Sequence, residues 1–221
     1  MTNQEDSSVL NKLASRIKPQ ANWKDLTSLP CAEVARLRDI ANRVRRSIRV
    51  GHEVARGGRF SGTIALFSGP TGTGKTMAAE ALARELEVDL YQIGLSKAVS
   101  KYIGETEKNL DGIFAAAERA SAVLFFDEAD ALFGKRSEVK DSHDRYANTD
   151  VEYLLLRLSE YPGLVILTTN SRKVQDEAFI RRLQFIVKFS PPSQEAKERI
   201  RHRPRSYNRK GRPAVGDPEK A

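Results

Sequence analysis

The sequence has little from which a disulfide-bonded, secreted or membrane-embedded protein could be built. Its 221 residues include one cysteine, Cys31, which excludes an internal disulfide framework. The longest apolar runs, such as residues 120–126, are far too short to cross a bilayer. The polar, acidic start over residues 1–8 lacks the apolar core of a signal peptide. These absences predict a cytoplasmic protein with no membrane partner.

Positive charge is in excess, with 37 Lys and Arg residues against 29 Asp and Glu and a net charge of +8. Much of the excess lies in residues 201–221, where seven Lys and Arg residues face only Asp217 and Glu219. Such a tail is either a solvated chain end or a nucleic-acid-binding segment. We favour the solvated end and do not expect nucleic acid as a partner.

Apolar runs of strand length alternate with helical periodicity after residue 62. The strands are predicted at 63–68, 88–93, 122–126, 164–169 and 183–189, and the helices at 75–86, 105–119, 145–160 and 176–182. An amphipathic helix over 32–50 precedes them, and a weak helical pattern covers 9–17. Five strands joined by helices predict an α/β fold with an open, mostly parallel sheet flanked by helices.

Three segments follow from these patterns. Residues 1–20 are predicted to be a flexible N-terminal segment, and residues 21–192 the α/β nucleotide-binding domain. Residues 193–221 begin as a short helix and continue as a basic stretch rich in Pro and Gly, which we expect to be disordered.

A phosphate-binding loop follows the first predicted strand of the sheet and opens a helix. It consists of Gly69, Pro70, Thr71, Gly72, Thr73, Gly74, Lys75 and Thr76, and it matches G-x-x-x-x-G-K-[ST] at every fixed position. Its backbone N–H groups and the helix N-terminus suit phosphate oxygens. Lys75 is expected to reach the β- and γ-phosphates of ATP, and Thr76 to bind Mg²⁺.

Two carboxylates follow the apolar run 122–126, which is typical of a central strand buried on both faces. Asp127 is expected to bind Mg²⁺ beside the P-loop. Glu128 is expected to act as the base that polarises the attacking water. A capping pair of surface acids is the structural alternative.

Residues 127–130 also spell the D-E-A-D tetrapeptide of a helicase family. That assignment requires a second RecA-like domain, for which the chain has no room. The next strand also ends in Thr168-Thr169-Asn170 instead of Ser-Ala-Thr. We therefore set the helicase interpretation aside.

With both motifs in place, the sequence from Trp23 to Phe189 resembles the classical AAA clade of the AAA+ ATPases, which are P-loop NTPases. Trp23-Lys24-Asp25-Leu26 is similar to the family segment that packs near the adenine. Asn170 resembles sensor 1, which implies a hydrogen bond to the γ-phosphate or the lytic water. The alternative for Asn170 is a helix cap or turn residue.

The resemblance also implies roles between subunits. Residues 176–185 resemble the arginine-finger segment, in which Arg181 is our first and Arg182 our second choice for acting on the neighbouring subunit's nucleotide. Tyr102, Ile103 and Gly104 resemble a pore loop that grips an extended polypeptide. A solvated basic helix end and two side chains packed under a loop are the respective alternatives.

Relatives continue into a helical lid that this sequence lacks or has truncated, and the chain is most similar to single-module bacterial or phage-like members. The resemblance implies a Mg²⁺-dependent ATPase that assembles into a homo-oligomeric, hexameric ring and remodels or unfolds an unknown protein substrate, as chaperone-like members do. Two alternatives stay open. One is a nucleotide-binding switch with little turnover, and the other is a nucleic-acid-associated AAA+ protein that uses the basic tail.

Overall fold

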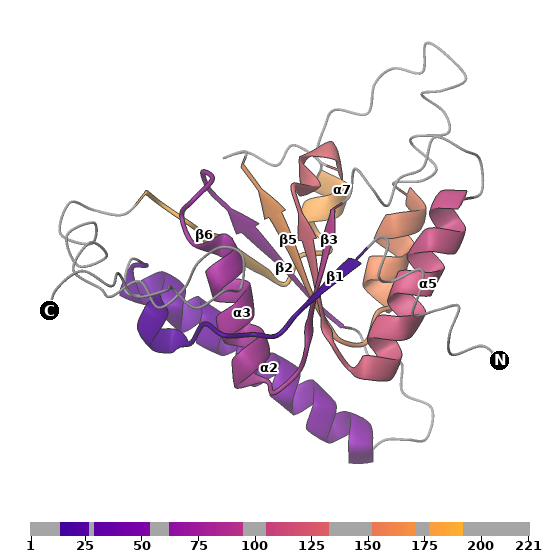
Figure 1. The fold of residues 1–221 in the computed structure, drawn as a ribbon, viewed down its shortest axis with the longest axis horizontal. Helices are drawn as coiled ribbons and strands as arrows, with labels where there is room; N and C mark the ends of the chain where they lie inside the picture. The colour runs from indigo at the N-terminus through magenta and orange to yellow at the C-terminus, as the bar shows by residue number, and fades with distance from the viewer. Residues whose placement is uncertain are drawn as a thin grey trace, which may run out of the picture.

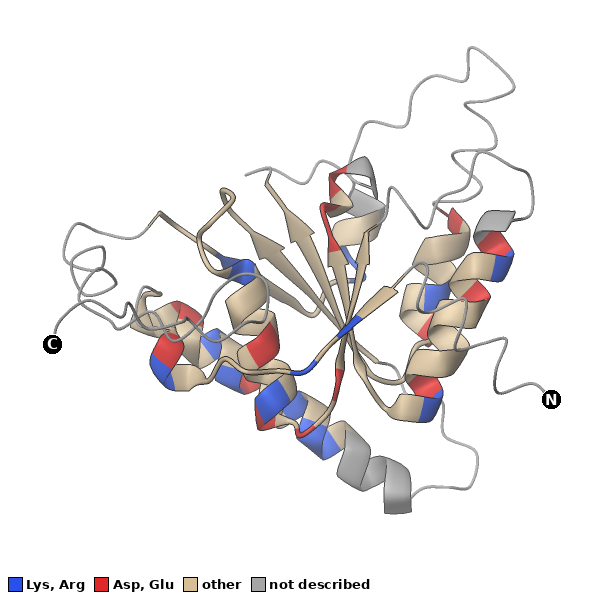
Figure 2. Cartoon of the chain, viewed as in Figure 1, with Lys and Arg blue, Asp and Glu red and all other residues tan. Residues whose placement is uncertain are grey.

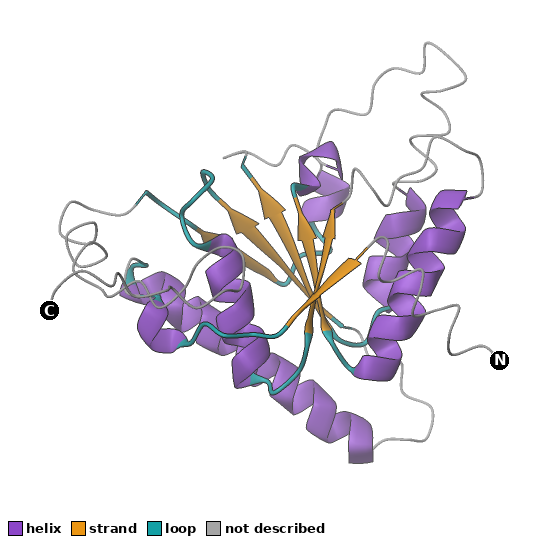
Figure 3. Cartoon of the chain, viewed as in Figure 1, coloured by secondary structure: helices purple, strands orange, loops and turns teal. Residues whose placement is uncertain are grey.

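The computed structural model describes residues 14–26, 29–53, 62–94, 105–132, 152–170 and 177–191. These residues form one sheet with helices on both faces, as the α/β prediction requires (Figure 1; Figure 3). The strands are β1 (Ala14–Ile17), β2 (Thr63–Ser68), β3 (Leu90–Gly94), β4 (Val123–Asp127), β5 (Leu164–Thr169) and β6 (Phe185–Lys188). The helices are η1 (Trp23–Asp25), α2 (Cys31–Glu53), α3 (Lys75–Glu85), α5 (Glu105–Ala120), η2 (Ala129–Leu132) and α7 (Glu177–Ile180), together with residues 152–160.

The strands lie in the order β1-β3-β4-β5-β2-β6. All neighbouring pairs are parallel except β1 with β3, which is antiparallel. The five predicted strands are present, but the count is wrong because β1 adds a sixth. The helix expected over 9–17 is wrong for residues 14–17, whose backbone pairs with the edge of β3 instead. The sheet therefore begins before residue 21.

Each central strand is buried on both faces, which explains its continuous apolar sequence. On β2, Ile64 and Leu66 pack into a cluster with α5 and residues 152–160. Ala65 and Phe67 alternate with them and pack on the opposite face against α2 and α3. The sheet thus divides two hydrophobic cores, one under each pair of helices visible in Figure 3.

The segment between β1 and η1 is fastened along α3. The carboxylate of Glu80, whose exposed fraction is 9%, accepts hydrogen bonds from the backbone N–H groups of Gln20 (3.2 Å) and Ala21 (3.3 Å). One helical turn further on, Arg84 donates to the carbonyl oxygen of Gln20 at 2.5 Å. A buried carboxylate requires such donors, so this segment is an integral part of the domain.

Basic residues recur along α2 (Figure 2), and most of them are exposed. Two of them form ion pairs within the fold: Arg45 pairs with Glu85 at 2.7 Å and Arg36 with Glu33 at 3.5 Å. Arg36 also donates to the carbonyl oxygen of Ile186, so α2 side chains cover part of the free edge of β6. None of the helices in the described part of the chain has the length and apolar character needed to span a bilayer.

A close backbone contact at the start of β2 predicts a large stability effect. A Cβ atom on Gly62 would lie 1.8 Å from the carbonyl oxygen of Tyr161, whereas a Cβ on Gly72 would meet nothing within 4 Å. We expect Gly62→Ala to lower the free energy of unfolding by about 3 kcal/mol or more. Gly72→Ala, at φ +80°, should cost roughly 1–2 kcal/mol from backbone strain alone. Urea unfolding of both variants checks this, and equal losses would contradict it.

Candidate functional site

The loop over residues 69–74 has a backbone that side chains would distort. Gly69, Gly72 and Gly74 have φ angles of +152°, +80° and +98°, which favour glycine. Gly69 is also packed closely, since a Cβ there would lie 2.0 Å from the carbonyl oxygen of Phe189. Gly74 is the N-cap of α3 and provides no side-chain cap. The first N–H groups of α3 are therefore suited to an anion.

Lys75 is the first residue of α3, and its exposed fraction is only 9%. Its ammonium donates to the carbonyl oxygens of Gly69 (2.5 Å) and Pro70 (3.0 Å) and to Oδ1 of Asn170 (3.0 Å). Burial lowers the pKa of Lys75, while the negative charges of Asp127 and Asp130 act in the opposite direction. The ammonium group of Lys75 is thus held in one orientation, between the carbonyl groups of the loop and the field of two carboxylates.

The sheet order explains why Asn170 reaches this lysine. β5 lies between β2 and β4, and Ser68 at the end of β2 is in register with Thr169. Asn170 therefore leaves β5 directly beside the loop, where its Oδ1 also lies 3.3 Å from the Thr71 hydroxyl. The position predicted for Asn170 beside the P-loop is the one observed, whereas its role toward a nucleotide stays a prediction.

Asp127 ends β4, and both of its carboxylate oxygens are held. The Thr168 hydroxyl donates to Oδ1 at 2.7 Å, and Gln92 Nε2 donates to Oδ2 at 3.2 Å. Glu128 follows with an exposed side chain and a φ of +56°. Its backbone N–H donates to the Thr168 hydroxyl at 3.1 Å. The two acids thus point differently, with Asp127 fixed at the strand end and Glu128 turned toward solvent.

Three polar residues of this region were given no role from the sequence: Gln92, Thr168 and Asp130. Asp130 in η2 accepts from the Thr169 hydroxyl at 2.5 Å and from the backbone N–H of Asn170 at 3.3 Å. Thr168 could have been found from the sequence. The polar residues Thr168 and Thr169 end the apolar run 164–167, which is unusual in a strand buried on both faces. Gln92 lies in β3, far from these residues in the sequence, so its contact could not be predicted.

The two candidate arginine fingers lie away from this group. Arg181 and Arg182 are exposed and precede Gln184, whose backbone N–H donates to the carbonyl of Ile64 at the amino end of β2. The P-loop leaves the carboxyl end of the same strand. The pore-loop residues Tyr102, Ile103 and Gly104 lie outside the described residues, as does the segment from 192 onward.

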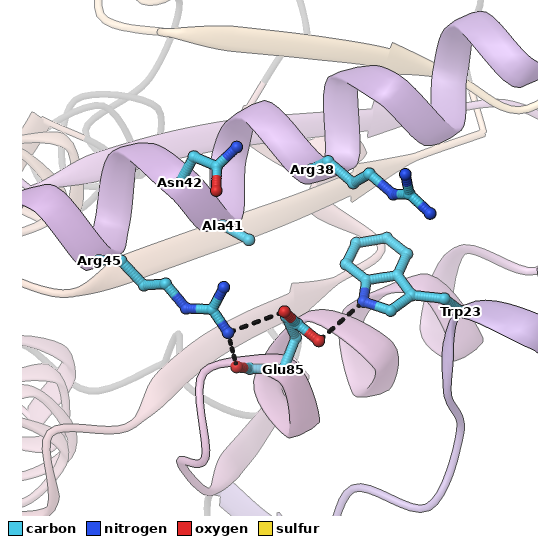
Figure 4. Close-up of a pocket in the computed structure, with 6 residues that line it drawn as sticks. All are labelled: Trp23, Arg38, Ala41, Asn42, Arg45 and Glu85. Atoms are coloured by element: carbon cyan, nitrogen blue, oxygen red, sulfur yellow. Dashed lines mark hydrogen bonds and ion pairs between the residues drawn. The ribbon is translucent and has the colours of Figure 1, made fainter.

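Trp23 does not lie near the phosphate-binding loop. Its indole Nε1 donates to Glu85 at 2.9 Å, and Glu85 is the last residue of α3 whereas Lys75 is the first. The length of α3 separates them by roughly 15 Å. Figure 4 shows the indole beneath Arg38, with Arg45 bound to the same carboxylate. These residues line a notch of about 240 Å³. Trp23 thus anchors the N-terminal segment to the end of α3, and the packing of residues 23–26 near an adenine stays a prediction.

The residues present fit a nucleoside triphosphate with a divalent cation. The glycine backbone and the start of α3 present N–H donors, and Lys75 adds a buried cation. Thr76, half-buried in the first turn of α3, and Asp127 offer the oxygen ligands that Mg²⁺ prefers. Within the described ranges, no group of three or more His, Cys, Asp and Glu side chains could hold a metal by itself.

The sequence over residues 65–191 matches the profile of one protein family, described as "ATPase family associated with various cellular activities (AAA)". The chain belongs to the AAA family. This family membership agrees with the P-loop, the central parallel sheet and the acidic pair that ends β4. AAA proteins bind nucleotides, typically with a divalent metal, and typically form oligomeric rings.

Individual AAA proteins show how far the similarity extends. The chain is 32% identical over 80% of its length to the AAA family ATPase y4kL of Sinorhizobium fredii, and covers 52% of that protein. It is 33% identical over 87% of its length to fidgetin-like protein 1 of Drosophila melanogaster, and covers 36% of it. Among solved structures, the FIGL-1 AAA domain in complex with ADP has a TM-score of 0.66 and 28% identity, with 90% of this chain and 66% of that one covered. The chain thus spans about half or less of the length of these two relatives.

Proposed function

We propose that this chain binds ATP with Mg²⁺ at the ends of β2, β5 and β4 and hydrolyses it. The observation that carries the proposal is the convergence on Lys75. Its ammonium contacts the loop carbonyls and Asn170 and lies in the field of Asp127 and Asp130. A cation held between a phosphate-binding loop and a carboxylate-bearing strand end suits phosphoryl transfer, where positioning and charge stabilisation supply most of the catalysis.

Binding of the phosphates falls to the loop and α3. The N–H groups over residues 71–76 face the phosphate oxygens, and the partial positive charge of the helix start adds to them. Lys75 exchanges its carbonyl partners for the β- and γ-phosphates. The Thr76 hydroxyl and Asp127 hold Mg²⁺, which when bound neutralises charge on the phosphate oxygens.

Hydrolysis requires a water molecule to be deprotonated beside the γ-phosphate. Glu128 supplies the base, because its carboxylate is exposed next to the fixed Asp127. Asn170 lies beside the loop, in contact with Lys75, and its side-chain amide either donates from Nδ2 to the γ-phosphate or accepts at Oδ1 from the water. Gln92 and Thr168 hold Asp127 in one orientation, so the metal ligand and the base keep separate directions.

Completion of the site by a second copy of the chain is part of the proposal. Arg181 and Arg182 precede β6 at the amino ends of the strands, whereas the P-loop follows the carboxyl end of β2. We infer that their guanidinium groups, which lie away from the P-loop of their own chain, act on a neighbour's γ-phosphate in a homo-oligomeric ring, which we expect to be hexameric. Such a ring would remodel a protein substrate gripped by Tyr102 and Ile103.

A concentration series tests hydrolysis and assembly together. We expect ATP turnover per subunit to rise with protein concentration to a plateau. At the plateau, Arg181→Ala should lower turnover by about a thousandfold, the lower range for an arginine finger. Arg182→Ala should have a smaller effect. Arg43→Ala removes an exposed arginine on α2 and is the matched control, expected to leave turnover unchanged.

The same series separates the alternatives. Lys75→Ala, which lacks the phosphate-binding ammonium, is the inactive reference. A wild type that binds nucleotide but hydrolyses ATP as slowly as Lys75→Ala at every concentration would be a nucleotide-binding switch, and this result would contradict the proposed hydrolysis. Turnover that is high but independent of concentration and of both arginines would contradict the shared site alone.

A further inference from the structure

We propose that Asp130 is a positioning residue that holds Asn170 in place to distinguish ATP from ADP. The inference rests on the proposed function, in which Asn170 faces the γ-phosphate. Asp130 is bound to the end of β5 by two hydrogen bonds, from the Thr169 hydroxyl at 2.5 Å and from the Asn170 backbone N–H at 3.3 Å. Its negative charge also acts on the Lys75 ammonium, but its hydrogen bonds to the end of β5 connect it directly to Asn170.

The local backbone brings Asp130 to this position. β4 and β5 are parallel neighbours in which Phe126 is in register with Leu167, so Asp127 and Thr168 come next to each other at the strand ends. The left-handed φ of +56° at Glu128 then turns the chain sharply into η2. This turn carries Asp130 past the end of β4 and onto the end of β5.

The arrangement divides two adjacent threonines between two acids. Thr168 and Thr169 alternate in direction along β5, and each has an exposed fraction of 1%. Asp127 takes the hydroxyl of Thr168, and Asp130 takes that of Thr169. One carboxylate thus belongs to the metal-binding side of the site, and the other fixes the residue that follows the strand.

A carboxylate is the group that this position requires. Asp130 accepts from a hydroxyl on one oxygen and from a backbone N–H on the other. An asparagine has only one acceptor oxygen and would turn an N–H₂ group toward a donor. Asn170 is then held on its backbone by Asp130 and on its side chain by Lys75 and Thr71. Small displacements of such a group are costly in a site that works by positioning.

Nucleotide selectivity provides a test that does not depend on turnover. Affinities for ADP and for the non-hydrolysable AMP-PNP, each with MgCl₂, are measured by calorimetry for the wild type, Asn170→Ala, Asp130→Asn and the double variant. Asp130→Asn should lower AMP-PNP affinity by about three- to tenfold, the effect of one lost hydrogen bond, and leave ADP affinity within about twofold of wild type. The double variant should be no weaker than Asn170→Ala alone, because the two residues act as one unit.

Two further variants keep the test independent of simple misfolding. Thr169→Val removes the hydroxyl that Asp130 accepts and should reproduce the selective loss, whereas Thr169→Ser keeps the hydroxyl and should restore wild-type selectivity. Asp111→Asn changes another hydrogen-bonded aspartate, which lies on α5 and accepts from the Tyr153 hydroxyl at 2.7 Å, and should leave both affinities unchanged. Thermal unfolding of each variant confirms that it is folded.

The outcomes separate this inference from the proposed function. An equal loss of ADP and AMP-PNP affinity in Asp130→Asn, no loss, or a fully additive double variant would overturn the positioning role. A wild type that bound both nucleotides without hydrolysing ATP would overturn the proposed ATPase activity. The affinities of the single and double variants for ADP and AMP-PNP would then still test the positioning role of Asp130. A wild type that bound neither nucleotide would overturn both.

Discussion

We expect Glu128→Gln to lower the rate of ATP hydrolysis by about a hundredfold or more, the range for removal of a general base, while ATP affinity stays near its wild-type value. The substitution keeps the size of the side chain and the backbone N–H bond to Thr168. It removes only the carboxylate that accepts the proton of the attacking water. Because Glu128 is exposed and packs no core, the free energy of unfolding should not change.

Single-turnover hydrolysis and nucleotide titration measure the two halves of this prediction. Glu118→Gln, an exposed glutamate on α5, is the matched control and should hydrolyse ATP at the wild-type rate. Comparable hydrolysis by Glu128→Gln and the wild type would exclude Glu128 as the base. A parallel loss of affinity and rate would instead indicate that Glu128 contributes to binding.

Lys75→Met should remove nucleotide binding without unfolding the protein. Hydrogen bonds to charged groups contribute about 1.5–3 kcal/mol, so the loss of contacts to two phosphates should weaken ATP binding by about a hundredfold or more. The free protein should be affected little. Burial lowers the pKa of Lys75, which shows that the fold disfavours the charged form, and this penalty offsets part of its hydrogen bonds to Gly69 and Pro70.

Thermal unfolding with and without MgATP tests both parts of that prediction. Ligand at a hundred times its dissociation constant stabilises a protein by about 2.7 kcal/mol, so the wild type should show a clear upward shift that Lys75→Met lacks. Lys188→Met, which changes an exposed lysine at the end of β6, should keep the full shift. A Lys75→Met protein that unfolds far more readily without nucleotide would show that the ammonium is chiefly structural.

Most of the fold was predictable because it depends on local patterns. The apolar runs of β2, β4 and β5 and the loop between β2 and α3 are visible in the sequence, and the structure confirms them. β1 was not predictable, since Ala14-Ser15-Arg16-Ile17 has no alternation strong enough to mark a strand. It pairs with the edge of β3, and the exposed Arg16–Asp89 ion pair accompanies this pairing; both are tertiary interactions.

The site was predictable to the same extent. Motif spacing located Lys75, Asp127 and Asn170, and the sheet order brings them together. The partners that orient them were not predictable, because Gln92 and Asp130 act on residues 35 to 40 positions away in the sequence. The contact of Trp23 with Glu85 was not predictable either, because the sequence does not tell which end of α3 receives the indole.

The fastening of the N-terminal segment to α3 has a mechanical consequence. Glu80, Arg84 and Glu85 tie residues 20–23 to the body of the same helix whose first residue is Lys75. Tension applied to the chain ahead of β1 would therefore be transmitted along two routes, sideways into β3 and along the axis of α3. The N-terminal segment and the phosphate-binding lysine are thus attached toward opposite ends of one helix.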